Sequence, residues 1–88
     1  MRTVYVLWSR KDRELYIGVS RDIKRRLKEH TEGRVSATRY RRPLILIFCE
    51  SFRHDRDATA RERYLKTGWG RKHLQKALQH TLSELNKN

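Results

Sequence analysis

Five side chains in this sequence can bind an anion, hold a cation or move a proton: Tyr5, Tyr16, Arg26, His30 and Glu62. Arg26 is permanently charged and can donate two parallel hydrogen bonds to one anion. His30 follows it by four residues, so on a helix both side chains project from one face. A tyrosine beside a cationic centre can have a lowered pKa and then accept a proton. Glu62 offers hard carboxylate oxygens, which suit Mg²⁺.

A β-hairpin and a helix are expected to position the first four of these residues. Residues 3–8 are rich in β-branched and aromatic side chains, and residues 15–19 form a second such run after a polar connection. Ser20 is a suitable N-cap for the helix that follows, with Asp22 in its first turn. We expect this helix to reach residue 29 or 30, and Gly33 to end it.

The second half of the chain predicts one more strand and two helices. Residues 44–49 form a continuous apolar run, which favours a strand covered on both faces, with Cys49 packed in the core. Asp55 or Asp57 can cap a second helix, which Gly68-Trp69-Gly70 would break before a third helix. The order is β-β-α-β-α-α. We expect an α+β fold with a three-stranded antiparallel sheet flanked by helices, as a single domain over residues 1–88 whose residues 84–88 are frayed.

The charge of the chain indicates a polyanionic partner. Its 88 residues include 22 Lys and Arg against 10 Asp and Glu, a net charge of +12, so nucleic acid is the natural partner. We expect no membrane role, because the charges do not lie opposite a broad apolar helix face and no apolar stretch approaches about 18 residues. A single cysteine and the lack of a signal-peptide layout fit the cytoplasm, in a bacterium the cytosol or nucleoid.

A basic loop over residues 34–42 is the candidate surface for tracking phosphates. Polar side chains alternate with its arginines, and cationic residues of the first helix extend it. A loop that only keeps the protein in solution is the alternative. The candidate nucleic-acid-binding residues are Lys24, Arg25, Arg34, Thr38, Arg39, Arg41 and Arg42.

The order of these motifs resembles the GIY-YIG nuclease superfamily, and in particular its small stand-alone bacterial members. Tyr16-Ile17-Gly18 matches the second half of the family motif, while Thr3-Val4-Tyr5 stands where the first half has Gly-Ile-Tyr. Arg26 and His30 occupy the helix after the second half-motif, as in the family. Glu62 lies on the next helix, where the family has its metal-binding glutamate. The resemblance covers nearly the whole chain and implies the GIY-YIG fold.

The resemblance also implies an activity, namely divalent-metal-dependent hydrolysis of DNA phosphodiester bonds by an endonuclease. Glu62 would anchor Mg²⁺ or Mn²⁺, and Arg26 would donate hydrogen bonds to the scissile phosphate. Tyr5 would accept a proton from water, and Tyr16 would orient the water or the phosphate. His30 would contact the phosphate or relay a proton. DNA is the expected substrate, with RNA as the alternative. We expect a monomer or weak homodimer, with any target specificity supplied by the basic loop, dimerisation or a partner protein.

Each site residue has a plainer interpretation. The two tyrosines are typical of half-buried strands. Arg25 competes with Arg26 for the site, since the two point about 100° apart on a helix. Glu62 completes a capping box if its helix begins at Thr59. A histidine near a helix C-terminus also interacts favourably with the helix dipole.

At the level of the whole molecule, two other functions compete with the enzyme. One is a catalytically weak or inactive module that keeps the fold and binds nucleic acid, which the altered first half-motif favours. The other is a structural RNA binder, which needs only the charge. His54, His73 and His80 lack paired metal-ligand spacing and are expected at the surface. Trp69 is expected to pack in the core or against a helix, with stacking on an unpaired base as the alternative.

Overall fold

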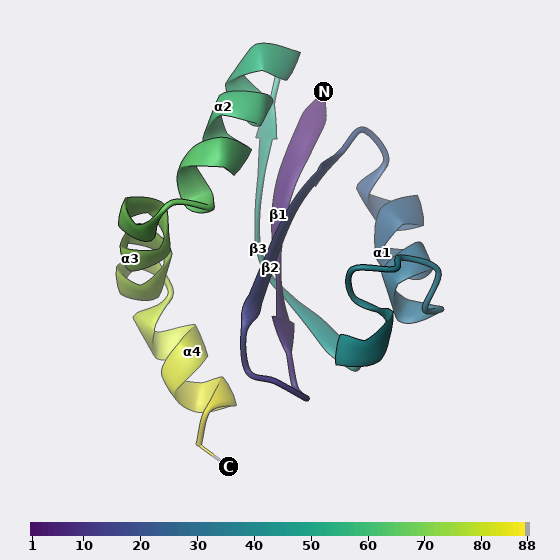
Figure 1. The fold of residues 1–88 in the computed structure, drawn as a ribbon. Coiled ribbons are helices and arrows are strands. Elements are labelled where there is room, and N and C mark those ends of the chain that lie inside the picture. The colour runs from purple at the N-terminus through teal and green to yellow at the C-terminus, as the bar shows by residue number, and fades with distance from the viewer. Residues whose placement is uncertain (88) are drawn as a thin grey trace.

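The computed structural model describes residues 1–87, which are arranged around a three-stranded antiparallel sheet (Figure 1). The strands are β1 (Arg2–Ser9), β2 (Leu15–Ser20) and β3 (Leu44–Phe52), in the spatial order β2-β1-β3. The helices are α1 (Ile23–Thr31), α2 (Asp55–Leu65), α3 (Gly68–Ala77) and α4 (Gln79–Leu85), with the short 3₁₀ helix η1 (Arg39–Arg41) before β3. This architecture confirms the predicted α+β fold.

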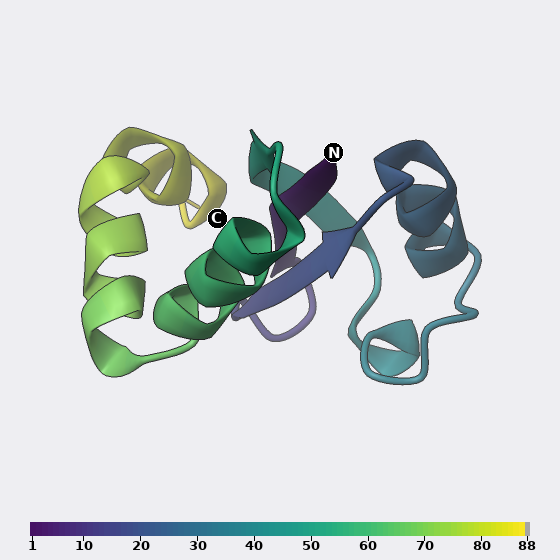
Figure 2. The same ribbon diagram turned by 90° about the horizontal axis from the view of Figure 1, so that it is seen from above.

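The sheet lies between two helical layers. Helix α1 and the loop carrying η1 cover one face, and α2, α3 and α4 cover the other (Figures 1 and 2). Strand β1 runs through the centre, and its residues from Val4 to Ser9 are buried because both faces are covered. Val4 and Val6 pack with Leu65 and Leu74 in the apolar core on the α2 side. Since side chains alternate along a strand, Tyr5 between the two valines faces the α1 side.

Helix α1 begins and ends at local signals, although the predicted cap is wrong by two residues. Asp22, not Ser20, is the N-cap, and its carboxylate accepts a hydrogen bond from the Arg25 amide. The Ser20 hydroxyl instead accepts from the Asp22 amide in the preceding turn. Gly33 ends the helix as predicted. Its φ is 76°, a backbone angle that residues with a side chain adopt only with strain.

Helix α2 begins at Asp55, but the residue that caps it was not predicted. The His54 imidazole accepts a hydrogen bond from the Arg56 amide, while Asp55 and Asp57 lie in the first turn, where acidic groups favour the helix dipole. Because α2 begins at Asp55, Glu62 lies in the helix interior. The capping-box interpretation of Glu62 is therefore excluded.

The Gly-Trp-Gly segment opens a helix, although it was expected to separate two. Thr67 caps α3 by accepting a hydrogen bond from the Gly70 amide. A Cβ on Gly70 would lie 2.0 Å from the Tyr64 carbonyl oxygen, so only glycine allows α3 to pack this closely on the end of α2. Trp69 is 76% exposed, so its predicted core packing is wrong. The predicted third helix is divided at Leu78 into α3 and α4.

Strand β3 is longer and less buried than its apolar sequence predicted. It pairs with β1 alone, and its side chains are only half-buried or exposed. Cys49 is exposed, so its predicted core packing is also wrong. The physical reason is the strand order, which gives the central, doubly covered place to β1 and leaves β3 at an edge of the sheet.

Two further features bear on the predictions. Within residues 1–87, none of the helices is long and apolar enough to cross a membrane. Of the tail predicted to fray, residues 84 and 85 form the end of α4, and residue 88 lies outside the described residues. The extent of the domain, residues 1–88, therefore stays a prediction.

Candidate active site

A buried chain of hydrogen bonds joins β1, α1 and the basic loop. The Tyr5 hydroxyl lies 2.8 Å from His30 Nε2, and His30 Nδ1 lies 2.7 Å from Thr38 Oγ1. All three side chains are at most 1% exposed. Both ring nitrogens of His30 are therefore occupied, which fixes the orientation of the imidazole between a phenol and a threonine hydroxyl.

Tyr16 completes an aromatic cluster on the same face of the sheet. Its ring centroid lies 5.2 Å from that of His30 and 6.3 Å from that of Tyr5. Gly18 is paired with Tyr5 across β1 and β2, and a Cβ there would lie 2.5 Å from the Tyr5 hydroxyl. The glycine of the Tyr-Ile-Gly motif thus leaves the space that the Tyr5 ring end occupies.

Arg26 supplies the positive charge of the cluster. It lies on α1, one turn before His30, and its guanidinium pairs with the Glu29 carboxylate at 3.1 Å. It also forms a hydrogen bond with the Tyr5 side chain. The side chain of Arg25, the competing candidate, is exposed. The backbone amide of Arg25 donates a hydrogen bond to the Asp22 carboxylate that caps α1. The structure therefore brings Arg26, and not Arg25, to the tyrosines.

The electrostatics of Tyr5 and His30 differ from the expectation for a proton-accepting tyrosine. Burial raises the pKa of Tyr5, and the hydrogen bond from Arg26 offsets this only in part. Burial and then the charge of Arg26 lower the pKa of His30. At neutral pH the chain thus consists of a protonated phenol and a neutral imidazole. The protein alone raises the pKa of Tyr5, and the expected lowering beside a bound cation stays a prediction.

Glu62 lies on α2, in the helical layer that covers the other face of the sheet (Figure 1). Its side chain is 19% exposed, pairs with Lys66 at 3.3 Å, and its charge contributes to the raised pKa of Tyr5. No group of three or more His, Cys, Asp and Glu side chains in residues 1–87 could hold a metal ion. A single carboxylate held only by a flexible lysine fits Mg²⁺, which keeps several waters and takes phosphate oxygens as ligands. It does not fit a site made wholly of protein ligands.

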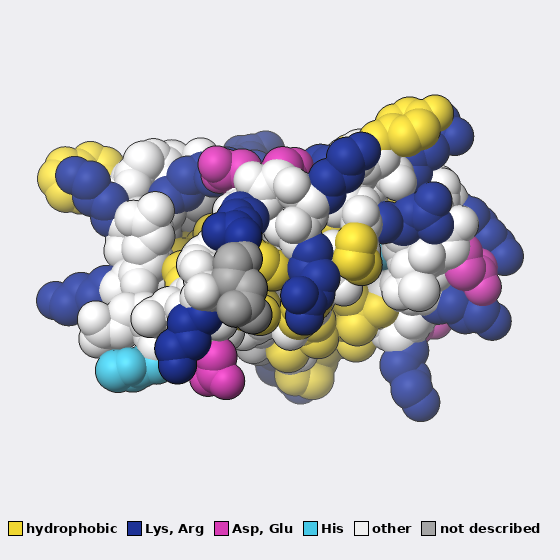
Figure 3. Space-filling model, turned by 90° about the horizontal axis from the view of Figure 1, so that it is seen from below, with side chains coloured by type: hydrophobic (Ala, Val, Ile, Leu, Met, Phe, Trp, Pro, Cys, Tyr) yellow, Lys and Arg dark blue, Asp and Glu magenta, His cyan; other side chains and the backbone are white. Residues whose placement is uncertain are grey.

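The predicted nucleic-acid-binding residues divide into exposed and engaged side chains. Lys24, Arg25, Arg34 and Arg39 are exposed, and Arg34 pairs with Glu32 at 2.8 Å. Lys and Arg side chains lie at both ends of the molecule and are not confined to one band (Figure 3). The positive charge on this face is therefore not gathered into a single patch.

Arg41 and Arg42 also hold the loop itself. Arg41 pairs with Asp12 of the hairpin turn and lowers the pKa of that carboxyl to about 2. Arg42 donates to the carbonyl oxygens of Thr31 and Arg39. These two arginines fix the position of η1 against the hairpin and α1.

Thr38 is the clear correction among the predicted surface residues. It is fully buried, and its hydroxyl is bonded to His30, so its side chain does not face a nucleic acid. The sequence held no signal for this partnership, because the two residues are eight apart and joined by an irregular loop. His54, His73 and His80 are exposed, as predicted.

Comparison with known proteins gives one family. The family model described as the GIY-YIG catalytic domain matches residues 1–76. The UPF0213 protein YazA of Bacillus subtilis is 42% identical over 57 residues, which cover 64% of this chain and 58% of YazA. The UPF0213 protein CPE1444 of Clostridium perfringens is 39% identical over 67 residues, which cover 75% of this chain and 71% of that protein. The matched region thus spans little more than half of YazA. No solved structure matches the chain significantly.

Proposed function

The chain belongs to the GIY-YIG catalytic-domain family, and from this premise we propose that it is a divalent-metal-dependent endonuclease that hydrolyses phosphodiester bonds of DNA. The observation that carries the proposal is the buried Tyr5–His30–Thr38 chain, with the Arg26 guanidinium beside its phenol end. A neutral imidazole held on both nitrogens is an acceptor for a proton. Arg26 supplies the positive charge that binds a phosphate.

The raised pKa of Tyr5 favours a relay over a free phenolate. In this mechanism a water molecule gives a proton to the Tyr5 oxygen while the Tyr5 proton passes to His30 Nε2. The water oxygen forms its bond to phosphorus as the bond to the leaving oxygen breaks, and Tyr5 ends the step protonated as it began. Thr38 accepts from Nδ1–H, which leaves Nε2 free to receive the proton. Tyr16, packed against His30, orients the water or phosphate.

Arg26 and Glu62 would act on the phosphate itself. Arg26 donates hydrogen bonds to phosphoryl oxygens and offsets the negative charge that grows on them. Glu62 would hold Mg²⁺ or Mn²⁺, which when bound stabilises charge on the phosphate and the leaving oxygen. We further propose residues 1–88 as one catalytic unit, working in the cytoplasm as a monomer or weak homodimer. The exposed Lys24, Arg25, Arg34 and Arg39 would contact the strands.

Glu62→Ala tests the proposal most directly. We expect cleavage of a fluorescent DNA to fall about 10³-fold or more, because a metal ligand supplies several kcal/mol of stabilisation in the transition state. Affinity for the same DNA, measured by anisotropy, should change by less than about twofold. Glu84→Ala, an exposed glutamate of α4, is the matched control and should cleave normally.

Two results would contradict the enzyme. Unchanged cleavage by Glu62→Ala would remove the metal ligand from the mechanism. Salt-dependent binding by the wild-type chain without any chelator-sensitive cleavage would favour the alternative, a catalytically inactive module that binds nucleic acid.

A further inference from the structure

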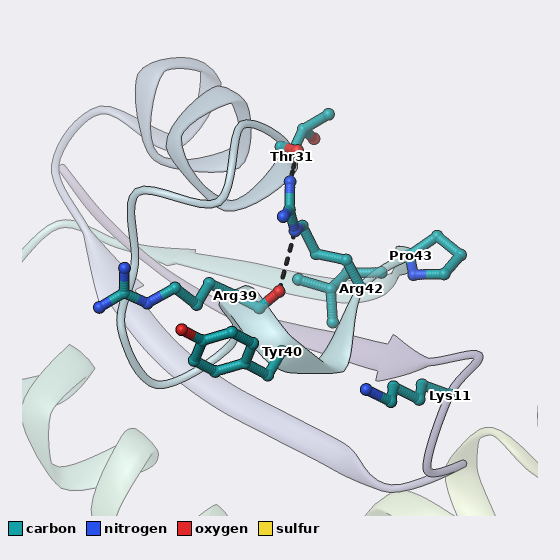
Figure 4. Close-up of a pocket in the computed structure, with 7 residues that line it drawn as sticks. Lys11, Thr31, Arg39, Tyr40, Arg42 and Pro43 are labelled. Carbon is teal, nitrogen blue, oxygen red and sulfur yellow. Dashed lines mark hydrogen bonds between the residues drawn. The ribbon is translucent and has the colours of Figure 1, made fainter.

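Tyr5, Tyr16, Arg26 and His30 form the catalytic cluster. A pocket beside this cluster has the shape and chemistry of a nucleotide site (Figure 4). Its volume is about 500 Å³, within the range of small-molecule sites. It is lined by the hairpin turn, the end of α1 and the η1 turn. Lys11, Arg39 and Arg42 are its charged lining residues, and no acidic side chain lines it. The ligand it favours is therefore an anion.

The pocket also holds an exposed aromatic ring. Tyr40 is 74% exposed on η1, and the Arg39 guanidinium lies 5.4 Å from its ring centroid. An exposed aromatic residue alone is ordinary on a protein surface. Here the ring stands among cations, with the Lys11 side chain extending toward it from the hairpin turn (Figure 4). A flat ring beside cations is the arrangement that holds an unpaired base and its phosphate.

The pocket is already formed before a ligand binds, because the Arg42 side chain is held in place. Arg42 donates to the carbonyl oxygens of Thr31 and Arg39, so its guanidinium is held at the pocket wall (Figure 4). Gly33 makes room for it, since a Cβ there would lie 2.7 Å from the Arg42 guanidinium carbon. A cation that is already placed loses little conformational freedom when an anion binds.

Two pairs of adjacent residues connect the pocket with the catalytic cluster. On α1, His30 belongs to the cluster and Thr31 lines the pocket. In the loop, Thr38 bonds His30, and the next residue, Arg39, lines the pocket. Consecutive Cα atoms are about 3.8 Å apart, so the pocket and the cluster are built on the same stretches of backbone.

We propose that this pocket binds one unpaired nucleotide of the substrate, with its base stacked on Tyr40 and its phosphate on Lys11, Arg39 and Arg42. A base inside a duplex is stacked and paired, so it cannot offer its face to the ring. The pocket therefore selects single-stranded nucleic acid, or a single-stranded flap, over a blunt duplex. This proposal takes one premise from the proposed function, namely that the ligand is a nucleic acid.

Binding without cleavage tests the pocket separately from the enzyme. Anisotropy titrations in EDTA would compare fluorescent oligo(dU), oligo(rU) and a blunt two-stranded DNA duplex of equal length. Tyr40→Ala should weaken binding of the preferred oligonucleotide about 5- to 150-fold, the usual range for loss of one base stack, and leave binding of the duplex unchanged. Tyr40→Phe keeps the ring and should bind as the wild type does. Trp69→Ala removes the equally exposed ring of α3 and is the matched control.

The outcomes separate the pocket from the activity. Tyr40-dependent binding of either oligonucleotide supports the pocket, and the tighter of the two assigns it to DNA or RNA. The proposal is overturned if Tyr40→Ala weakens binding of single strands and of the duplex equally, if it weakens neither, or if Trp69→Ala has the larger effect. Tight Tyr40-dependent binding without metal-dependent cleavage would support the pocket while contradicting the nuclease. Chelator-sensitive cleavage by the wild-type chain, together with binding in EDTA that does not depend on Tyr40, would do the reverse.

Discussion

The two faces of strand β1 use the same backbone for opposite purposes. On the α2 side, Val4 and Val6 pack against Leu65 and Leu74 in a core without polar side chains. On the α1 side, Tyr5 is bonded to His30 and His30 to Thr38, so hydrogen bonds join three buried side chains. One face stabilises the fold by excluding water, whereas the other holds polar groups in a fixed geometry.

The difference matters because the two faces respond differently to substitutions. An apolar core loses stability in proportion to the area and volume that a substitution disturbs. A buried polar network fails when a single partner is missing, since an unpaired group has no water to replace it. Substitutions in the apolar core on the α2 side should therefore act mainly on unfolding, and those in the hydrogen-bonded chain on the α1 side mainly on cleavage.

Gly70→Ala should give the largest effect on stability and tests the structural role of the α2 side. The new methyl group would lie 2.0 Å from the Tyr64 carbonyl oxygen and 2.5 Å from the Leu65 Cα, so backbone must move. We expect the free energy of unfolding in urea to fall by about 3 kcal/mol, the upper part of the range for overpacking. Gly68→Ala is the control, because nothing lies within 4 Å of its added Cβ. Equal stability of the two variants would show that the close contact at Gly70 does not limit stability.

Gly18→Ala is the corresponding change on the α1 side and should act on the reaction. Its methyl group would meet the Tyr5 hydroxyl at 2.5 Å, and the end of a side chain can shift where backbone cannot. We expect cleavage to fall about 100-fold, as for a catalytic group displaced by about 1 Å. Stability should change by less than in Gly70→Ala. A variant that unfolds early but cleaves normally when folded would reverse the assignment of the two faces.

Thr38→Val tests whether the hydroxyl positions His30. The substitution keeps the shape of the side chain but leaves His30 Nδ1 without its partner. We expect about 1 kcal/mol of destabilisation from the unpaired nitrogen and a fall in cleavage of about tenfold. Thr38→Ser restores the hydroxyl and should restore the rate, which a loss of packing alone would not explain. Failure of that rescue would show that Thr38 serves only the fold.

These contrasts also explain how far the sequence could predict the molecule. Periodic segments have local causes, so the hairpin, α1, α2 and the antiparallel sheet were predicted, with Gly33 as the end of α1. The burial of β3 and Cys49 was not, because strand order decides which strand is covered on both faces. Trp69 looked apolar enough for the core, but the close approach at Gly70 sets the direction of α3 and leaves the ring in solvent.

The site was predicted only as far as family motifs reach. Tyr5, Tyr16, Arg26 and His30 were named from motif positions, and the structure brings them together, while their chemical roles stay predictions. Thr38 was assigned to the nucleic-acid-binding surface because it alternates with arginines in a basic loop. Its burial follows from a contact between α1 and the loop that no local pattern encodes.

The pH dependence of stability is the smallest expected effect and separates the two faces without changing any packing. Burial and Arg26 lower the pKa of His30 in the folded protein, whereas the unfolded chain has the ordinary value of about 6.5. As pH falls through about 6.5 toward the lowered pKa, the unfolded state binds more protons. The stability contributed by neutral His30 is therefore complete above this window and is lost within it.

Urea unfolding between pH 5 and 8 would measure this loss against a variant. His30→Gln cannot titrate, so its free energy of unfolding should fall less steeply below pH 6.5 than that of the wild type. His54, His73 and His80 are present in both proteins, and their contributions cancel in the difference. Leu74→Ala is the control on the apolar face, and it should lower stability about equally at every pH. Parallel curves for the wild type and His30→Gln would mean that His30 is not held neutral, and the relay from Tyr5 would lose its acceptor.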